Sequence, residues 1–402
     1  MQRIHSQQCK TFLLSPEVLL SVFVYIMIAL IGYQTLPPYM QTTCVLYYGI
    51  VSVSYLLLVM AQPHRVKGKV LTFPMILSGG LMWWLLGFRD ISGVDDETYN
   101  RIFDQVATMS TFHWIDFLYL EPGYLFFNYI ISLCTDNYYV FQAIASFIPI
   151  FFIYKGFFKY KHLIYVPLAF LLFAMTLFFQ MLSVSLIRMF IAIGFVFYFS
   201  LDFLFKAQLK KYILSITLIA TIHYSCIIML IFVPLLIWKK QLEQNWFAFL
   251  ISLSLISIAG FLLVGRLAAA IGGRYAMYGE SGEGGFSIMA LDTLPFFIVA
   301  FLFKIIIPKI YQPQYMICVI LLAFSSVFSV LSEWVPLGRI IFYTNLSIWI
   351  ILPAIFKFSR CNWLLVAVLT IIYSFLYLYT TQFLVELRAE HLFPYRNLFF
   401  TL

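Results

Sequence analysis

Charged side chains are what this sequence has least of. Only 10% of its 402 residues are Asp, Glu, Lys or Arg and 63% are hydrophobic, whereas soluble domains carry about 25% charged residues. The deficit excludes an ordinary soluble protein and predicts an all-α polytopic membrane protein, because apolar runs long enough to cross a bilayer recur along the chain. The net charge of +8 comes from short clusters at the ends of these runs and forms no basic stripe, so we expect no nucleic-acid partner.

Several motifs are also missing. The six cysteines show no CxxC or CxxH spacing, so neither a disulfide framework nor a zinc site is predicted. No DxD triplet occurs, and we expect neither a metal nor another cofactor. The first apolar stretch lacks a small-residue cleavage site and is long enough to span, which predicts a retained first helix and not a removed signal peptide.

The apolar runs predict one membrane domain over residues 1–402. Eleven crossings are expected, at residues 17–35, 44–61, 70–88, 138–155, 163–182, 184–205, 246–265, 288–307, 315–333, 338–356 and 363–383. All fourteen lysines lie in loops on one side of this arrangement, while eight of the eleven arginines lie on the other side or inside the membrane. By the positive-inside rule the Lys-rich side is cytoplasmic, which puts the N-terminus inside and the C-terminus outside.

The stretch 212–238 tests this topology, because it is apolar yet Lys-rich at both ends. A single tilted span would move every later loop to the opposite side of the membrane. A re-entrant or broken helical hairpin, with two arms meeting near Thr221, His223 and Ser225, keeps the later lysines inside, and we favour it over the plain span. Irregular backbone at membrane depth is tolerated only where it lines an enclosed or wet cavity, so this choice places His223 near a site.

Two outer loops stand out. The larger, residues 89–137, holds eight of the seventeen acidic residues. Within it apolar side chains recur at i, i+3, i+4 and i+7, namely Tyr99, Ile102, Phe103 and Val106. This stripe predicts an amphipathic helix lying along the membrane surface. The second loop, residues 266–287, is Gly-rich and predicted to be mobile.

Arginines on the outer side are the candidate anion ligands, since a guanidinium binds phosphate oxygens two at a time. Arg89 closes the third span and is either a snorkelling anchor or a site residue. Arg188 lies inside an apolar run, where an unpaired guanidinium costs about 2.5 to 3.5 kcal/mol or more. It therefore needs an internal carboxylate, such as Glu333, or an anionic ligand. Arg339 and Glu333 flank a short outer turn and either neutralise one another or lie beside Arg188.

The candidate bases are one histidine and two carboxylates. His223 is the histidine embedded in an apolar segment, and it is either a packing group or a proton acceptor near neutral pH. Asp95 and Asp96 follow Arg89 closely. Either could be the N-cap of the helix that contains Tyr99, and a cap and a catalytic carboxylate are compatible roles.

Six sequence islands resemble the EpsG-like branch of the Wzy-type polysaccharide polymerases. They are GFRDISGVDDETYNRIF, EPGYLFFNYII with Glu121, SLIRMFIAIGFVF with Arg188, LIATIHYSCIIML with His223, LGRIIFYTNL with Arg339, and HLFPYRN with Tyr395. They occur in the family's order from about residue 87 onward. The first departs from the family's usual Gly-Thr-Asp-Tyr-like run, which leaves open whether Asp95 or Asp96 takes the family role.

The resemblance implies a GT-C-like membrane glycosyltransferase of the bacterial plasma membrane, with its site on the outer face. Such an enzyme transfers a growing O-antigen, capsule or exopolysaccharide chain from undecaprenyl diphosphate to the non-reducing end of a lipid-linked repeat unit. Its partners would be the lipid-linked donor and acceptor, membrane lipids, and in addition a chain-length regulator and a flippase.

The residues of the islands suggest a division of roles in such a reaction. We expect Arg188 and Arg339 on the diphosphate, His223, Asp95 or Asp96 as the base, and further substrate contacts from four residues: Arg89, Tyr99, Glu121 and Tyr395. Glu333 is expected beside the arginines. An O-antigen ligase would differ only in its acceptor. A flippase or other secondary transporter is the alternative from another class, although transporters tend to show internal repeats and polar residues spread over many central spans.

Overall fold

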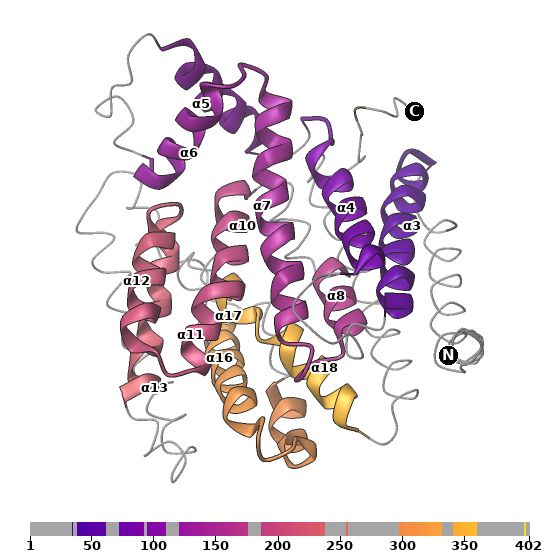
Figure 1. Cartoon of the computed structure of the whole chain (residues 1–402), viewed down its shortest axis with the longest axis vertical. Coiled ribbons are helices and arrows are strands. Elements are labelled where there is room, and N and C mark those ends of the chain that lie inside the picture. The colour runs from indigo at the N-terminus through magenta and orange to yellow at the C-terminus, as the bar shows by residue number, and fades with distance from the viewer. Residues whose placement is uncertain are drawn as a thin grey trace. The chain divides into compact units, whose positions relative to one another are not determined.

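The computed structural model of the chain shows helices joined by turns and short connections in the part that it describes (Figure 1). The described residues are 38–61, 72–91, 95–109, 120–175, 186–237, 297–331 and 341–359, with Gln34, Leu255 and Leu398. They belong to two compact units, residues 1–194 with 359–402 and residues 195–358. Each unit is described by itself.

The first unit contains seven described helices, the last of which ends at the unit's boundary. They are α3 (Pro38–Ala61), α4 (Phe73–Gly87), α5 (Asp96–Thr108), α6 (Pro122–Ser132), α7 (Tyr138–Lys159), α8 (Val166–Met175) and α10 (Ile187–Phe195). Prolines stand at the starts of α3, α4 and α6, where a missing N–H leaves no helical bond unmade.

Small residues allow the helices of this unit to approach closely. Ser78 of α4 donates to the carbonyl of Ser54 on α3 at 3.0 Å, and its hydroxyl also lies 2.9 Å from the Tyr154 hydroxyl of α7. The ring of Tyr154 lies beside Gly79, where an added Cβ would meet it at 3.6 Å. Small residues at such contacts are typical of helix pairs in membranes.

The contact between α7 and α10 is closer still. Pro149 lies inside α7, where a proline removes one backbone hydrogen bond and bends the helix. Gly194 of α10 lies against this point, and a Cβ added there would stand 2.7 Å from the Pro149 Cα. Only glycine fits at this position, because the neighbouring atom is backbone and does not rotate away.

The second unit continues from α10 and contains nine described helical elements. They are the π-helix η3 (Val196–Ser200), α11 (Leu201–Phe205), α12 (Leu209–Ala220), the 3₁₀ helices η4 (Tyr224–Phe232) and η6 (Phe303–Ile306), α13 (Val233–Ile237), α16 (Gln312–Leu331), α17 (Ile341–Asn345) and α18 (Ile348–Phe358). With η3 among them, the helices of this unit depart from regular α geometry at several places.

The segment 212–238 forms two antiparallel arms in its described part. Helix α12 ends at Ala220, His223 has extended backbone (φ −151°, ψ 109°), and η4 begins at Tyr224. The Tyr212 hydroxyl donates to the carbonyl of Met229, which a single straight helix would hold more than 20 Å away. A break at 221–223 and a fold back along α12 are therefore present. Whether the hairpin is re-entrant in a membrane stays a prediction.

Three expected crossings are confirmed as helices long and apolar enough to span a membrane. They are Tyr138–Lys159, Ile187–Phe205 and Ile341–Phe358, against the expected 138–155, 184–205 and 338–356. Other described helices agree with expected spans but are shorter or only partly described. Apart from Gln34 and Leu255, the expected spans 17–35, 246–265 and 363–383, and the loop 266–287, lie outside the described residues. The total of eleven spans and the GT-C architecture stay predictions.

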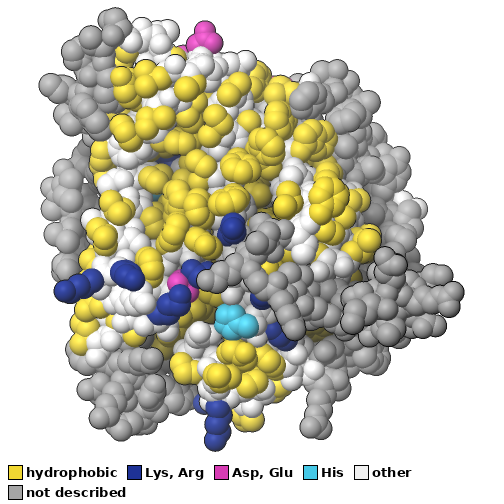
Figure 2. Space-filling view, viewed as in Figure 1, with side chains coloured by type: hydrophobic (Ala, Val, Ile, Leu, Met, Phe, Trp, Pro, Cys, Tyr) yellow, Lys and Arg dark blue, Asp and Glu magenta, His cyan; other side chains and the backbone are white. Residues whose placement is uncertain are grey.

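One face of α7 carries the exposed apolar stripe of a lipid-facing helix. Its members are Val140, Ile144, Phe147 and Phe151, each 38–44% exposed. Exposed apolar side chains also dominate the view in Figure 2, where the described Lys and Arg side chains are confined to a few places. A soluble protein rarely exposes such a surface, so these helices belong in a membrane.

We expect Gly194→Ala to destabilise the protein by about 1–3 kcal/mol, because its Cβ would overlap the backbone of Pro149. The measurement is the thermal unfolding of the purified protein in detergent. Gly80→Ala is the matched control, since a Cβ there meets nothing within 4 Å, and it should leave the unfolding temperature equal or raised. Equal behaviour of the two variants would contradict the close α7–α10 contact.

Candidate functional site

Helix α5 carries the predicted apolar stripe, but protein and not lipid covers it. Tyr99, Ile102, Phe103 and Val106 are at most 4% exposed. Phe103 packs on Phe141 of α7 with the ring centroids 4.8 Å apart, and a small core joins Ile102 and Val106 to Leu120 and Leu125 of the α6 region. The expectation of a helix resting on the membrane surface by this stripe is therefore corrected, because α6 and α7 bury it.

Arg89 holds the start of α5 against the end of α4. Its Nη1 and Nη2 atoms each donate to one carboxylate oxygen of Asp96 at 2.8 Å, and Nη1 also donates to Gln142 Oε1 at 2.7 Å. Both charged side chains are fully buried. A bidentate pair of this kind is strong and directional, and removing one partner leaves an unmatched buried charge.

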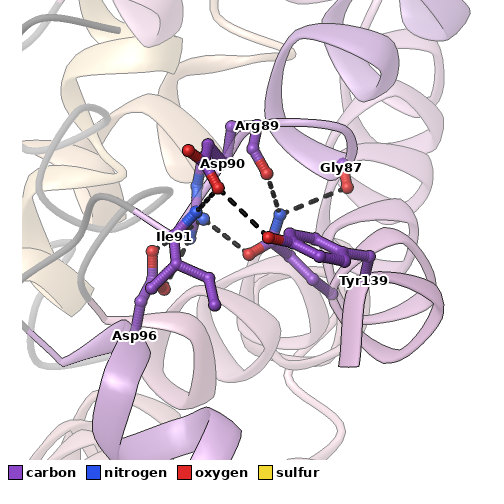
Figure 3. A network of polar contacts seen from close by, with 7 residues as sticks. Gly87, Arg89, Asp90, Ile91, Asp96 and Tyr139 are labelled. Carbon is purple, nitrogen blue, oxygen red and sulfur yellow. Dashed lines mark hydrogen bonds and ion pairs between the residues drawn. The ribbon is translucent and has the colours of Figure 1, made fainter. Parts of the chain in front are cut away.

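Further hydrogen bonds surround the Arg89–Asp96 pair (Figure 3). Gln142 Nε2 donates to the carbonyl of Arg89 at 2.8 Å and to that of Gly87 at 3.3 Å. The carboxylate of Asp90 accepts from the Tyr139 hydroxyl at 3.1 Å and from the Ile91 backbone N–H at 2.8 Å (Figure 3). The network joins α4, α5 and α7 into a rigid corner at the beginning of the large loop.

Arg188 has a different environment from Arg89. Arg188 Nη1 donates to Glu121 Oε2 in a short ion pair. The Arg188 side chain is 19% exposed, whereas that of Glu121 is 4% exposed. The internal carboxylate that Arg188 was expected to need is therefore Glu121, whereas Glu333 lies outside the described residues. Arg188 Nε has no hydrogen-bond partner within the described ranges, so the guanidinium retains donor capacity.

Two tyrosines flank the Arg188 guanidinium. Its Cζ lies 5.7 Å from the ring centre of Tyr99 and 5.5 Å from that of Tyr124, which is within cation–π range. The two rings meet edge to face, with centroids 6.1 Å apart. Burial raises the pKa of the Tyr124 phenol well above its usual range, so the ring stays neutral. The two rings flank the guanidinium, while 19% of the Arg188 side chain is exposed.

The position of Arg188 on its helix strengthens its demand for an anion. It is the second residue of α10, where the first backbone N–H groups have no intrahelical partner and the helix dipole is positive. A cation at this position is unfavourable unless a negative group lies beside both the guanidinium and the helix N-terminus. Glu121 supplies one such group, and the same arrangement can bind a phosphate.

His223 lies in the second unit, at the break between α12 and η4. It is 9% exposed, and its carbonyl accepts from the Cys226 N–H at 3.0 Å. Nearby, Ser225 Oγ donates to the Tyr343 hydroxyl of α17 at 3.2 Å. The structure therefore joins the hairpin to a helix that belongs to a different sequence island.

Of the remaining predicted site residues, only Asp95 lies among the described residues. Asp95 occupies the N-cap position of α5 without a side-chain cap bond, and its carbonyl accepts from the Tyr99 N–H at 2.9 Å. Glu333, Arg339 and Tyr395 lie outside the described residues. The C-terminal tail nevertheless reaches the first island, because the Leu398 N–H donates to the Phe88 carbonyl at 2.9 Å.

Sequence reasoning missed two residues of this region. Gln142 is a polar side chain inside the apolar run 138–155, where a polar residue is rare, and that signal could have identified it. Tyr124 follows Glu121 by three residues, which places both on one side of α6. No signal distinguished it from the many other tyrosines of this chain.

Comparison with known proteins gives one match. The model of the EpsG family matches residues 72–397, which is more than half of the chain and includes every residue of the site. Neither a curated protein nor a solved structure matches.

We expect Asp96→Asn to destabilise the protein by about 3–5 kcal/mol, because it leaves Arg89 charged and unmatched in the interior. The measurement is the amount of monodisperse protein recovered from membranes and its unfolding temperature. Asp104→Asn, on the exposed side of α5, is the control and should behave as wild type.

The double variant Arg89→Met with Asp96→Leu should recover much of the lost stability, since apolar residues of similar volume often replace a buried pair without loss. A stable Asp96→Asn protein that lacks only activity would contradict the anchoring role. It would return Asp96 to the list of candidate bases.

Proposed function

Because the chain belongs to the EpsG family, we propose that it is a metal-independent membrane glycosyltransferase that polymerises glycan repeat units. The family indicates a function of the polysaccharide-polymerase type, and the apolar helices make the chain a membrane protein. The donor would be the growing chain of an O-antigen, capsule or exopolysaccharide on undecaprenyl diphosphate. The acceptor would be the non-reducing end of a lipid-linked repeat.

The partly exposed side chain of Arg188 is the observation that supports this proposal most. Transfer from a polyprenyl diphosphate places negative charge on the leaving phosphate, and a preorganised cation in a poorly hydrated site stabilises that charge. Arg188 has the aromatic walls, the helix N-terminus and the unused donor for this role. Arg89 differs, because its side chain is fully buried, Asp96 binds both of its terminal nitrogens and Gln142 also accepts from Nη1.

Other residues take supporting roles in the proposed reaction. We expect Arg339 and Glu333 to add charged contacts to the substrate, and Tyr99 and Tyr395 to offer aromatic and hydroxyl contacts to sugars. Arg89 positions α5 and does not touch substrate. His223 and Asp95 remain candidate proton acceptors, and Asp96 has the weaker claim because Arg89 binds both its oxygens.

The proposed location is the plasma membrane of a bacterium, with the site facing the periplasm or the cell exterior. The charge bias of the loops supports this orientation, since the lysines cluster away from the island that contains Arg89. A lipid-linked donor and acceptor delivered to the outer face by a flippase would meet the site there.

We expect Arg188→Gln to lower the rate of chain growth by about 100-fold or more, the loss typical of removing one group that stabilises a developing anion. Arg188→Lys should recover part of the rate, because it keeps the charge but loses the planar fork. The measurement is glycan length in cells whose own copy is deleted. Arg101→Gln is the control, since Arg101 is exposed on α5.

The accumulating intermediate distinguishes the alternatives. A polymerase defect leaves single lipid-linked repeats on the outer face, detected by an impermeant sugar-oxidising label. Repeats trapped inside would indicate a flippase. Full-length chains that remain on the lipid carrier and fail to reach a lipid core would indicate a ligase.

A further inference from the structure

The ion pair between Glu121 and Arg188 occupies the carboxylate of the one residue and a guanidinium N–H of the other. The carboxylate of Glu121 is buried and contacts Nη1 of Arg188, so it covers the guanidinium that the proposed donor needs. Glu121 also occupies the N-cap position of α6, yet its side chain makes no cap hydrogen bond. A carboxylate at a helix N-terminus is normally stabilised there, and this one is directed to the arginine.

We propose that Glu121 is the general base of the transfer and that the donor diphosphate releases it by taking its place on Arg188. This inference rests on the proposed function, because it requires that the donor is a diphosphate bound by that arginine. Glu121 then has two positions, one on Arg188 without the donor and one facing the acceptor hydroxyl with it.

The charges of Glu121, Arg188 and the diphosphate favour this exchange. Without a ligand, one buried carboxylate neutralises one guanidinium. The diphosphate link of a glycan donor carries two negative charges, and the planar fork of an arginine binds two oxygens at once, so the ligand competes well for the guanidinium. Once displaced, the carboxylate lies beside new negative charge, which increases its affinity for a proton. A carboxylate with raised proton affinity is the better base at neutral pH.

Glu121 is better suited to this role than the other carboxylates of the first unit. Asp96 is held by two hydrogen bonds from the fully buried Arg89. Glu121 contacts Nη1 of Arg188, whose side chain is 19% exposed, and Pro122 follows it at the start of α6. Its backbone is extended (φ −69°, ψ 131°), so side-chain rotation alone can move the carboxylate without unwinding the helix.

The chemical step balances without any further reactant. The acceptor hydroxyl oxygen forms a bond to the anomeric carbon of the donor sugar, and the bond from that carbon to the phosphate oxygen breaks. The polyprenyl diphosphate leaves with the electron pair and remains on Arg188. The hydroxyl proton passes to the Glu121 carboxylate, which later returns it to solvent as the ion pair re-forms.

The exchange also protects the donor. A base that was always exposed beside the anomeric carbon could activate water and hydrolyse the donor. Here the base is held by Arg188 until the diphosphate arrives, and Glu121 is then close to the place where the acceptor must bind.

The test compares Glu121→Gln with Asp104→Asn, a carboxamide change on the exposed side of α5. Binding is measured with undecaprenyl diphosphate on purified protein in nanodiscs. Transfer is measured with lipid-linked repeats extracted from cells that lack this chain. We expect Glu121→Gln to bind undecaprenyl diphosphate roughly fivefold or more tightly, because the competitor for Arg188 is gone. Its transfer rate at saturating donor should fall by about 100-fold or more.

A second variant covers the case in which Glu121→Gln does not fold. Glu121→Asp keeps the negative charge for Arg188 but shortens the side chain, so it should bind the probe nearly as wild type and still lose most of its transfer rate. Transfer at the wild-type rate in either variant would overturn the proposal. Equal loss of binding and transfer would also overturn it and leave Glu121 a structural partner of Arg188.

Arg188→Gln separates this inference from the proposed function. If that variant binds undecaprenyl diphosphate as wild type does, the diphosphate site itself is wrong. If Arg188→Gln loses binding while Glu121→Gln keeps normal transfer, the diphosphate site stands and only the role of Glu121 fails.

Discussion

A guanidinium at the start of an apolar helix must have an anion beside it, and the candidate site is organised around that requirement. Arg188 meets it with Glu121, which lies 67 residues earlier in the chain. The pair draws α6 towards α10, and Tyr99 and Tyr124 enclose the charge. Loss of Glu121 or of the two rings would leave Arg188 charged in an environment of low dielectric, where an unmatched cation is expensive.

Arg89 and Arg188 show how burial distinguishes a structural arginine from one that can bind a ligand. Arg89 is fully buried and bound on two nitrogens by Asp96, so its charge is matched within the protein. Arg188 is partly exposed, has one carboxylate, and keeps a donor without a partner among the described residues. Arg89 therefore sets the geometry of the loop, and Arg188 has the capacity to bind an anion from outside the chain.

Much of the helix pattern could be predicted, but the contacts could not. The crossings at 138–159, 187–205 and 341–358 follow from hydropathy alone, because a long apolar run must be helical to satisfy its backbone in a membrane. The stripe of α5 was visible for a similar reason, since its period is a property of neighbouring residues. What covers that stripe was not visible, because lipid and the aromatic face of α7 have the same polarity.

The sequence by itself determined that the chain is a helical membrane protein, where its apolar segments lie, and which polar residues are unusual enough to require partners. These follow from composition and local period, which involve residues close together in the chain. Only the tertiary structure decided that Asp96 belongs to Arg89 and Glu121 to Arg188. Those pairings depend on distances and burial between separate helices, and a guanidinium accepts any carboxylate that the fold brings within reach.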